Sequence, residues 1–303
     1  MAADLARPTP AGLTPLVTEL QTRYGAALHA VVLYGSCRRD KDIHDGLVDL
    51  LVLVSSYRAV HGAHPARLLN RLLPPNVYFL QSDFNQQRLR SKYAIITLDQ
   101  FESRCASFSD HYFWARFSQP ARLLMSDNRA DTAQRIAEAR AVAARQFALR
   151  IAPTTASPLS WQAFWELAMS TTYRCELRPE SVGHARRLIE ADPTYWQSLT
   201  YSLAEEGSLK KDDSDLFSSN AAGRASRTIT RFEWMVRRVT GKLFNLARLF
   251  KAAGTFSNGI DYITWKVERH SGVRVEPTER MRRHPRLAAW GLAWRLWRRG
   301  GFR

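Results

Sequence analysis

The stretch 31–54, VVLYGSCRRDKDIHDGLVDLLVLV, constrains the fold most, because two apolar, β-rich runs flank a Gly-Ser turn. Residues 31–33 predict a buried strand, and Gly35-Ser36 lets the backbone turn closely enough for amides and a hydroxyl to meet phosphate groups. Asp49 interrupts the second apolar run. Because a carboxylate is costly to bury without a compensating cation, we predict that Asp49 holds Mg²⁺ that carries nucleotide phosphates.

This arrangement outlines a nucleotidyltransferase fold, in which the Gly-Ser turn is commonly followed by an aspartate pair at i and i+2. Leu47 occupies the first of those two positions here, so Asp49 is the main predicted metal ligand. Asp45 is the predicted second ligand, with Asp42 and Asp40 as alternatives. The competing interpretation is an ordinary turn and a strand-end aspartate without a catalytic role.

Further segments follow this stretch in a fixed order. They are Tyr34-Gly35-Ser36, Val48 to Leu51, Val60-His61, Asn76-Val77-Tyr78, Lys92 to Ile96, Ala115-Arg116 with Gln119-Pro120, and Ser170 to Arg178. In this order they resemble the mitochondrial-type phosphatidate cytidylyltransferases, the soluble CDP-diacylglycerol synthases. The chain departs from that family at Cys37, where the family has glycine, at Glu176, where it has aspartate, and at Val60, where it has tryptophan.

The resemblance implies transfer of CMP from CTP to phosphatidic acid, giving CDP-diacylglycerol and pyrophosphate, with Mg²⁺ as cofactor. It assigns Asp49 to the metal, Lys92 to catalysis and phosphate contact, and a triphosphate-binding set to Tyr34, Gly35, Ser36, Lys92 and Arg116. His61, His64, Tyr173, Glu176 and Arg178 are predicted to line the pocket or join the domains, and a structural role is favoured for Glu176. The alternative interpretations are that Lys92 is solvated, that Arg116 pairs with an acid, and that the histidines are packed or lie on the surface.

We predict an α/β protein with a nucleotidyltransferase-like domain over 1–150 built on a small mixed sheet. A helical second domain over 151–223 and a basic aromatic segment over 224–303 follow. Expected helices lie at 11–30, 61–73, 127–150, 159–170, 181–192 and 229–250, and expected strands lie in the pair within 31–54 and at 76–80 and 92–97. The polar stretch 205–224 is predicted to be a mobile link.

Charge is concentrated at the end of the chain. Residues 224–303 carry 19 Lys and Arg against 5 Asp and Glu, whereas residues 1–223 carry 25 against 23. Apolar residues recur at helical spacing in the first part of this segment: Ile229, Phe232, Met235, Val236, Val239, Leu243, Leu246 and Phe250. Trp290, Trp294 and Trp297 follow near the end, and tryptophan favours the lipid headgroup zone.

These features predict a peripheral protein on an anionic membrane surface, at the cytoplasmic face of the cell membrane. Two alternatives stay open for the segment: the helix 229–250 packs on the globular domain, or the basic tail binds nucleic acid. The tryptophans favour lipid over nucleic acid. The sequence contains no run of 18 apolar residues, so we expect no membrane-spanning helix. The first ten residues lack the apolar core of a signal peptide.

For the whole chain, the leading prediction is phosphatidate cytidylyltransfer. The alternatives are nucleotidyl transfer to a soluble or RNA acceptor, and a catalytically inactive, basic nucleic-acid-binding protein.

Overall fold

The computed structural model describes residues 1–8, 10, 12–38, 47–62, 66–84, 87–127, 131–176, 183–220, 223–255, 278, 279 and 281. Several residues for which the sequence makes predictions lie outside this part of the chain: Asp40, Asp42, Asp45, His64, Arg178, Trp290, Trp294 and Trp297.

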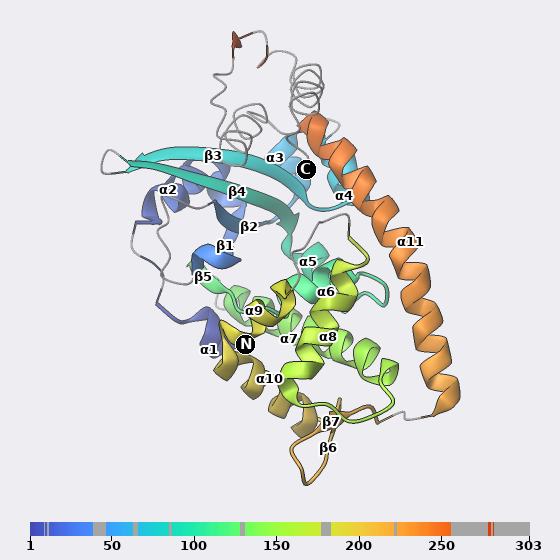
Figure 1. The fold of residues 1–303 in the computed structure, drawn as a ribbon. Coiled ribbons are helices and arrows are strands. Elements are labelled where there is room, and N and C mark those ends of the chain that lie inside the picture. Colours follow the sequence, from blue (N-terminus) through green and yellow to red (C-terminus); the bar gives the residue numbers. More distant parts are fainter. Residues whose placement is uncertain are drawn as a thin grey trace.

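Five strands form one mixed sheet in the order β3, β4, β2, β1, β5 (Figure 1). Their bounds are β1 Leu28–Tyr34, β2 Val48–Val54, β3 Asn76–Phe84, β4 Gln87–Thr97 and β5 Arg122–Ser126. Strands β2 and β4 run parallel, and the other neighbouring pairs are antiparallel. The predicted α/β class with a small mixed sheet is confirmed, as is the antiparallel strand pair expected within 31–54.

Helices surround the sheet in the described part of the chain (Figure 1). They are α1 Ala2–Leu5, α2 Thr14–Tyr24, α3 Tyr57–His61, α4 Ala66–Leu72, α5 Leu98–Ala106, α6 His111–Phe117, α7 Thr132–Ile151, α8 Trp161–Tyr173, α9 His184–Glu190, α10 Pro193–Glu205 and α11 Arg224–Thr255. Short 3-10 turns lie at η1 Gly25–Ala27, η2 Ser36–Arg38 and η3 Ala152–Thr154.

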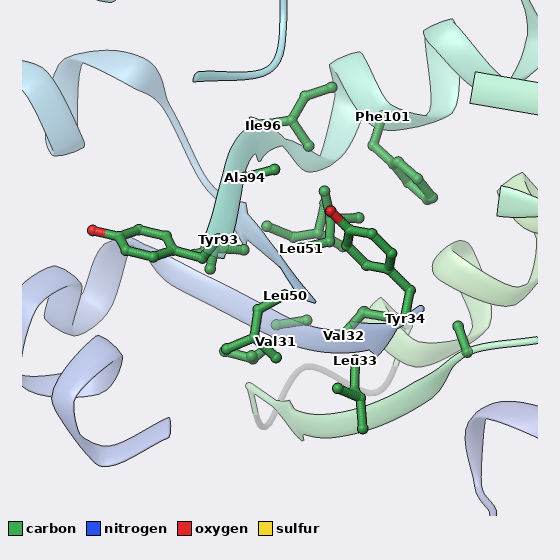
Figure 2. Close-up of a cluster of buried hydrophobic side chains, with 14 of the residues drawn as sticks. Val31, Val32, Leu33, Tyr34, Leu50, Leu51, Tyr93, Ala94, Ile96 and Phe101 are labelled. Carbon is green, nitrogen blue, oxygen red and sulfur yellow. The ribbon is translucent and has the colours of Figure 1, made fainter. Parts of the chain in front are cut away.

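Both faces of the central strands are covered, as their nearly continuous apolar sequences predict. On one face, the hydroxyl groups of Tyr24 in α2 and Tyr93 in β4 lie 3.0 Å apart. On the other face, Tyr34 at the end of β1 points to the same side as Leu51 and Phe101, the latter from α5 (Figure 2). The sheet therefore has an α2 face and an α5–α6 face, and only the second carries Tyr34.

A second apolar core lies beyond the sheet and is built around tryptophans. Trp114, Trp165 and Trp196 are fully buried there, and Trp165 Nε1 donates to Thr200 Oγ1 at 2.8 Å. Helix α7 joins the two cores, because Ile136 packs in the sheet core and Phe147 packs in the tryptophan core. The expected change from a sheet domain to a helical region near residue 150 thus falls within a helix that both cores share.

The stretch 205–224 differs from its predicted role as a mobile link. It contains a two-stranded hairpin of β6 Lys210–Lys211 and β7 Phe217–Ser218. Leu209 and Phe217 are buried in the tryptophan core, and Phe217 exchanges backbone hydrogen bonds with Leu159. The prediction was wrong because two apolar side chains anchor a segment whose average composition is polar.

Several boundaries also differ from the sequence expectation. The helix expected over 61–73 corresponds to α4 alone, because His61 is the last residue of α3, which ends at Gly62 with a φ of +56°. The helix expected over 11–30 ends at Tyr24, and β1 begins at Leu28. Strand β5 and helices α5, α6 and α10 were not among the predicted elements.

Helix α11 lies along one side of the molecule, from the β6–β7 hairpin to α4 (Figure 1). Its inner face is buried against the body: Trp234 Nε1 donates to the Arg150 carbonyl at 2.8 Å, and Lys251 Nζ donates to the Pro75 carbonyl at 2.8 Å. At Gly241 a Cβ atom would lie only 2.7 Å from the Cys175 carbonyl oxygen. The helix therefore packs on the globular body, one of the two alternatives left open by the sequence.

The outer side of α11 carries apolar residues. Its outer apolar stripe consists of Ile229, Phe232, Val236, Val239 and Leu243, with Met235 and Phe244 at the edges, and each of these side chains is exposed. Exposed basic side chains run beside this stripe: Arg231, Arg238 and Lys242. None of the helices in the described part of the chain is long and apolar enough to cross a bilayer.

Candidate active site

Gly35 and Asp49 approach each other closely where β1 and β2 pair. Gly35 has a φ of +79°, a conformation that residues with a Cβ atom rarely adopt. A Cβ atom at this position would lie 2.9 Å from Asp49 Oδ2. The turn after β1 thus brings bare backbone against a carboxylate, and the adjacent Ser36 is exposed.

Tyr34, Asp49 and Lys92 occupy one row across three adjacent strands. Tyr34 pairs with Asp49 in the antiparallel β1–β2 ladder, and Asp49 pairs with Lys92 in the parallel β2–β4 ladder. Laterally paired residues project from the same face of a sheet, here the α5–α6 face. The row extends to Phe79 on β3, which is buried. Register therefore brings together a phenol, a carboxylate and an ammonium group that lie far apart in the sequence.

Arg116 of α6 lies beside this row. Its guanidinium carbon is 5.5 Å from the ring centre of Tyr34 and 4.7 Å from that of Tyr112. Burial and then the negative charge of Asp49 raise the pKa of the Tyr34 phenol, and the positive charge of Arg116 opposes that rise. The phenol is therefore protonated at neutral pH and lies within electrostatic reach of both ions.

Glu176, just beyond α8, completes the charged group around Arg116. Burial alone would lower the pKa of Arg116, but Tyr112, Tyr34, Glu176 and Asp49 outweigh that effect and raise it. Glu176 is itself buried. Arg116 Nε is buried without a hydrogen-bond partner among the described residues. The chain beyond α8 thus contributes an acid to the charged group around Arg116.

Two contacts hold the turn segment in place. Cys37 Sγ donates to the Leu47 carbonyl at 3.3 Å, so this side chain links the two ends of the loop that follows β1. Arg38 is buried and forms a bidentate ion pair with Asp192, which precedes α10, through Nη1 to Oδ1 at 2.9 Å and a second bond from Nη2. Sequence reasoning missed Arg38, although a basic residue two positions after the Gly-Ser turn was the available signal.

His61 lies on the opposite face of the sheet from this group, and Tyr173 packs on α9. The ring of His61 lies 6.3 Å from that of Tyr57 and 6.1 Å from that of Tyr78. Because Tyr78 precedes Phe79 on β3, it projects from the α2 face, opposite Asp49. Tyr173 packs against His184 with ring centres 5.6 Å apart. The structure therefore places these two predicted residues in packing positions.

The carboxylates needed for a metal ion are sparse. No group of three or more His, Cys, Asp and Glu side chains in the described part of the chain is arranged to hold a metal. Mg²⁺ usually takes one or two protein carboxylates, several waters and substrate phosphates. Asp49 beside the open backbone of Gly35 fits the role of such a carboxylate, and the predicted partner Asp45 lies outside the described residues.

No protein-family model matches this sequence, and no curated protein is similar to it. Among solved structures, a nucleotidyltransferase-like protein from Exiguobacterium sibiricum aligns with 95% of this chain and 91% of its own, at 10% sequence identity and a TM-score of 0.27. At this TM-score the likeness supports no assignment of function.

Proposed function

We propose that this protein is a nucleotidyltransferase that moves CMP from CTP to phosphatidic acid at a membrane surface. The main support is the close approach of Gly35 to Asp49: a Cβ atom added at Gly35 would lie 2.9 Å from Asp49 Oδ2. A turn with accessible backbone amides can bind phosphate oxygens, and a neighbouring carboxylate can hold the metal ion that accompanies them.

In the proposed reaction, a phosphate oxygen of the acceptor forms a bond to the α-phosphorus of CTP. The bond from that phosphorus to the β-bridging oxygen breaks, and pyrophosphate leaves. Both reacting groups are anionic, so catalysis consists mainly of charge neutralisation and in-line alignment.

The chain's residues have distinct parts in this reaction. The Gly35 amide and the Ser36 hydroxyl bind the β- and γ-phosphates, and Lys92, in the same row as Asp49, contacts a phosphate. Arg116, held between Tyr34 and Tyr112, presents a fixed positive charge to the developing negative charge. Asp49 would hold Mg²⁺, which when bound neutralises the triphosphate.

The acceptor part of the proposal is supported by the resemblance to phosphatidate cytidylyltransferases and by α11. The outer apolar stripe with its neighbouring basic residues has the pattern of a helix that lies in the headgroup plane of an anionic membrane. We propose that it acts at the cytoplasmic face of the cell membrane.

The test is pyrophosphate release from CTP and Mg²⁺ with phosphatidate in mixed micelles. Wild-type protein should turn over with phosphatidate and not with diacylglycerol, which lacks the attacking phosphate. Asp49→Asn should reduce turnover by two or more orders of magnitude, the scale of losing one electrostatic stabiliser. Asp213→Asn, the same substitution at an exposed aspartate, is the matched control and should leave turnover unchanged.

Two results would contradict the proposal. Near-normal turnover by a folded Asp49→Asn protein would remove Asp49 from the site. Turnover with RNA or a soluble acceptor in place of phosphatidate would support nucleotidyl transfer but exclude a lipid as the acceptor.

A further inference from the structure

A pocket of about 440 Å³ separates α11 from the segment that joins α5 to α6. One wall is formed by residues 104–112 and the other by one side of α11 between Phe232 and Arg248. Its size is in the range of small-molecule sites. None of the residues assigned to nucleotide transfer lines it.

The polar lining of this pocket has more positive than negative charge. Arg104 donates to Asp110 at 3.3 Å, Arg248 lies 4.0 Å from the same carboxylate, and Arg237 pairs with Glu233 at 3.0 Å. Three guanidinium groups thus share two carboxylates. The excess positive charge favours an anionic ligand.

Two buried polar side chains in the lining have unused hydrogen-bonding atoms. His111 is 7% exposed and Arg237 is 5% exposed. Nδ1 of His111 and Nε of Arg237 have no hydrogen-bond partner within the described part of the chain. Both atoms are closed to solvent, so the pocket attracts an anion through the charge of Arg237 and not through a hydrogen bond to either atom. Burial and then the charges of Arg237 and Arg248 lower the pKa of His111 to about 4, so its ring is neutral at physiological pH.

The apolar lining is continuous with the surface of the molecule. Three apolar residues of α11 line the pocket: Phe232, Val236 and Phe244. They also belong to the outer apolar stripe or its edge, with exposed fractions of 60%, 42% and 53%. A small hydrophilic anion would leave this apolar surface unused. A ligand with an anionic head and an apolar chain would cover both parts of the lining.

We propose that this pocket binds the anionic head of one lipid molecule, with the acyl chain leaving along Phe232, Val236 and Phe244. The proposal does not depend on nucleotidyl transfer. The pocket and the candidate active site are nevertheless neighbours, because Arg248 and Arg116 lie 4.4 Å and 4.7 Å from the ring centre of Tyr112.

The experiment is calorimetric titration of the full chain with decyl phosphate below its micelle-forming concentration. We expect saturable binding of one molecule per chain, at least tenfold tighter than that of inorganic phosphate or of decyl maltoside. These two probes carry the head charge alone and the tail alone.

Arg248→Met should weaken decyl phosphate binding at least tenfold. Arg186→Met is the matched control, because it makes the same substitution at an exposed arginine of α9, outside both the pocket and the outer apolar stripe. If Arg248→Met does not fold, judged by its thermal unfolding, Arg104→Met on the opposite wall replaces it with the same expected loss. A soluble-anion site is indicated instead if inorganic phosphate binds as tightly. Equal binding of decyl maltoside, or equal weakening by the pocket variant and the control, also overturns the proposal.

Discussion

Arg38 and Asp192 form a buried bidentate ion pair between the turn after β1 and the start of α10. The pair joins residues that are 154 positions apart in the sequence. It fixes the segment that carries Gly35 and Ser36 to the helical part of the chain. The candidate site is therefore held by a contact between the two cores as well as by the sheet.

Breaking this pair should destabilise the protein strongly. We expect Arg38→Gln or Asp192→Asn to lower the free energy of unfolding by about 3–5 kcal/mol, because each leaves one buried charge without its partner. Urea denaturation of the purified variants measures this. The double variant should lose clearly less than the sum of the two single losses, and strictly additive losses would show that the pair is not coupled.

Gly35 should not tolerate even a methyl group. Gly35→Ala combines a positive φ, which costs an L-residue about 1–2 kcal/mol, with a contact of 2.9 Å to Asp49 Oδ2. Gly183→Ala and Gly207→Ala are the controls, because both glycines have a φ close to that of Gly35 and an added Cβ would lie no closer than 3.7 Å to another atom. In urea denaturation, Gly35→Ala should lose more stability than either control, and it should also lose pyrophosphate release.

A double variant separates the steric cost at Gly35 from the backbone cost. Adding Asp49→Ala to Gly35→Ala should recover part of the lost stability, since the obstructing carboxylate is gone. If Asp49→Ala adds its own loss without recovery, the two residues do not meet as the structure has them.

The sheet and the outline of the site follow from the sequence to a large extent. Alternation and apolar runs indicated β1, β2 and β4, and the Gly-Ser turn with Asp49 indicated where they meet. Lys92 was expected near phosphate, but no local pattern reveals that register places it beside Asp49. Such pairings depend on strand order, which a single sequence does not encode locally.

The contacts that the sequence did not predict are mainly those between residues far apart in the chain. Helical periodicity revealed the apolar stripe of α11, but the same pattern normally marks the buried face of a helix. Here the inner face is formed instead by Trp234, Arg237, Gly241 and Lys251, a mixed set that no hydrophobic pattern would select. The inner face depends on specific partners, such as the Arg150 and Pro75 carbonyls, which only the fold brings into reach.

Stability should fall at acidic pH in a way that depends on His111. Its pKa is about 4 in the folded protein, lowered by burial and by Arg237 and Arg248, against an ordinary value of 6.5. Between these two values the unfolded chain binds more protons, so the free energy of unfolding decreases as the pH falls from 6.5 to 4. The full effect is roughly 3 kcal/mol.

The measurement is urea denaturation at a series of pH values for the wild type and His111→Gln. Other groups titrate in the same range, so the quantity of interest is the difference between the two pH profiles. That difference should develop between pH 6.5 and 4 and be constant above pH 7. Parallel profiles would show that His111 is accessible to protons in the folded state.

The outer apolar stripe should govern attachment to anionic vesicles. Val239 and Leu243 are 61% and 62% exposed, so replacing both with serine should leave the free energy of unfolding almost unchanged. Burying one such side chain in the membrane interface contributes about 1.5–3 kcal/mol, so we expect vesicle partitioning to fall at least tenfold. Co-sedimentation with phosphatidylglycerol-rich vesicles measures this.

The matched control is Leu68→Ser with Leu149→Ser, which removes two exposed leucines from α4 and α7. This pair should leave partitioning unchanged. Wild-type protein should leave the vesicles as salt rises, because Arg231, Arg238 and Lys242 lie beside the stripe and ionic screening weakens their attraction to the surface.

Equal losses in both double variants would assign binding to general hydrophobicity. Binding to RNA with a steep salt dependence, in a protein that ignores vesicles, would reassign this face of α11 to nucleic acid.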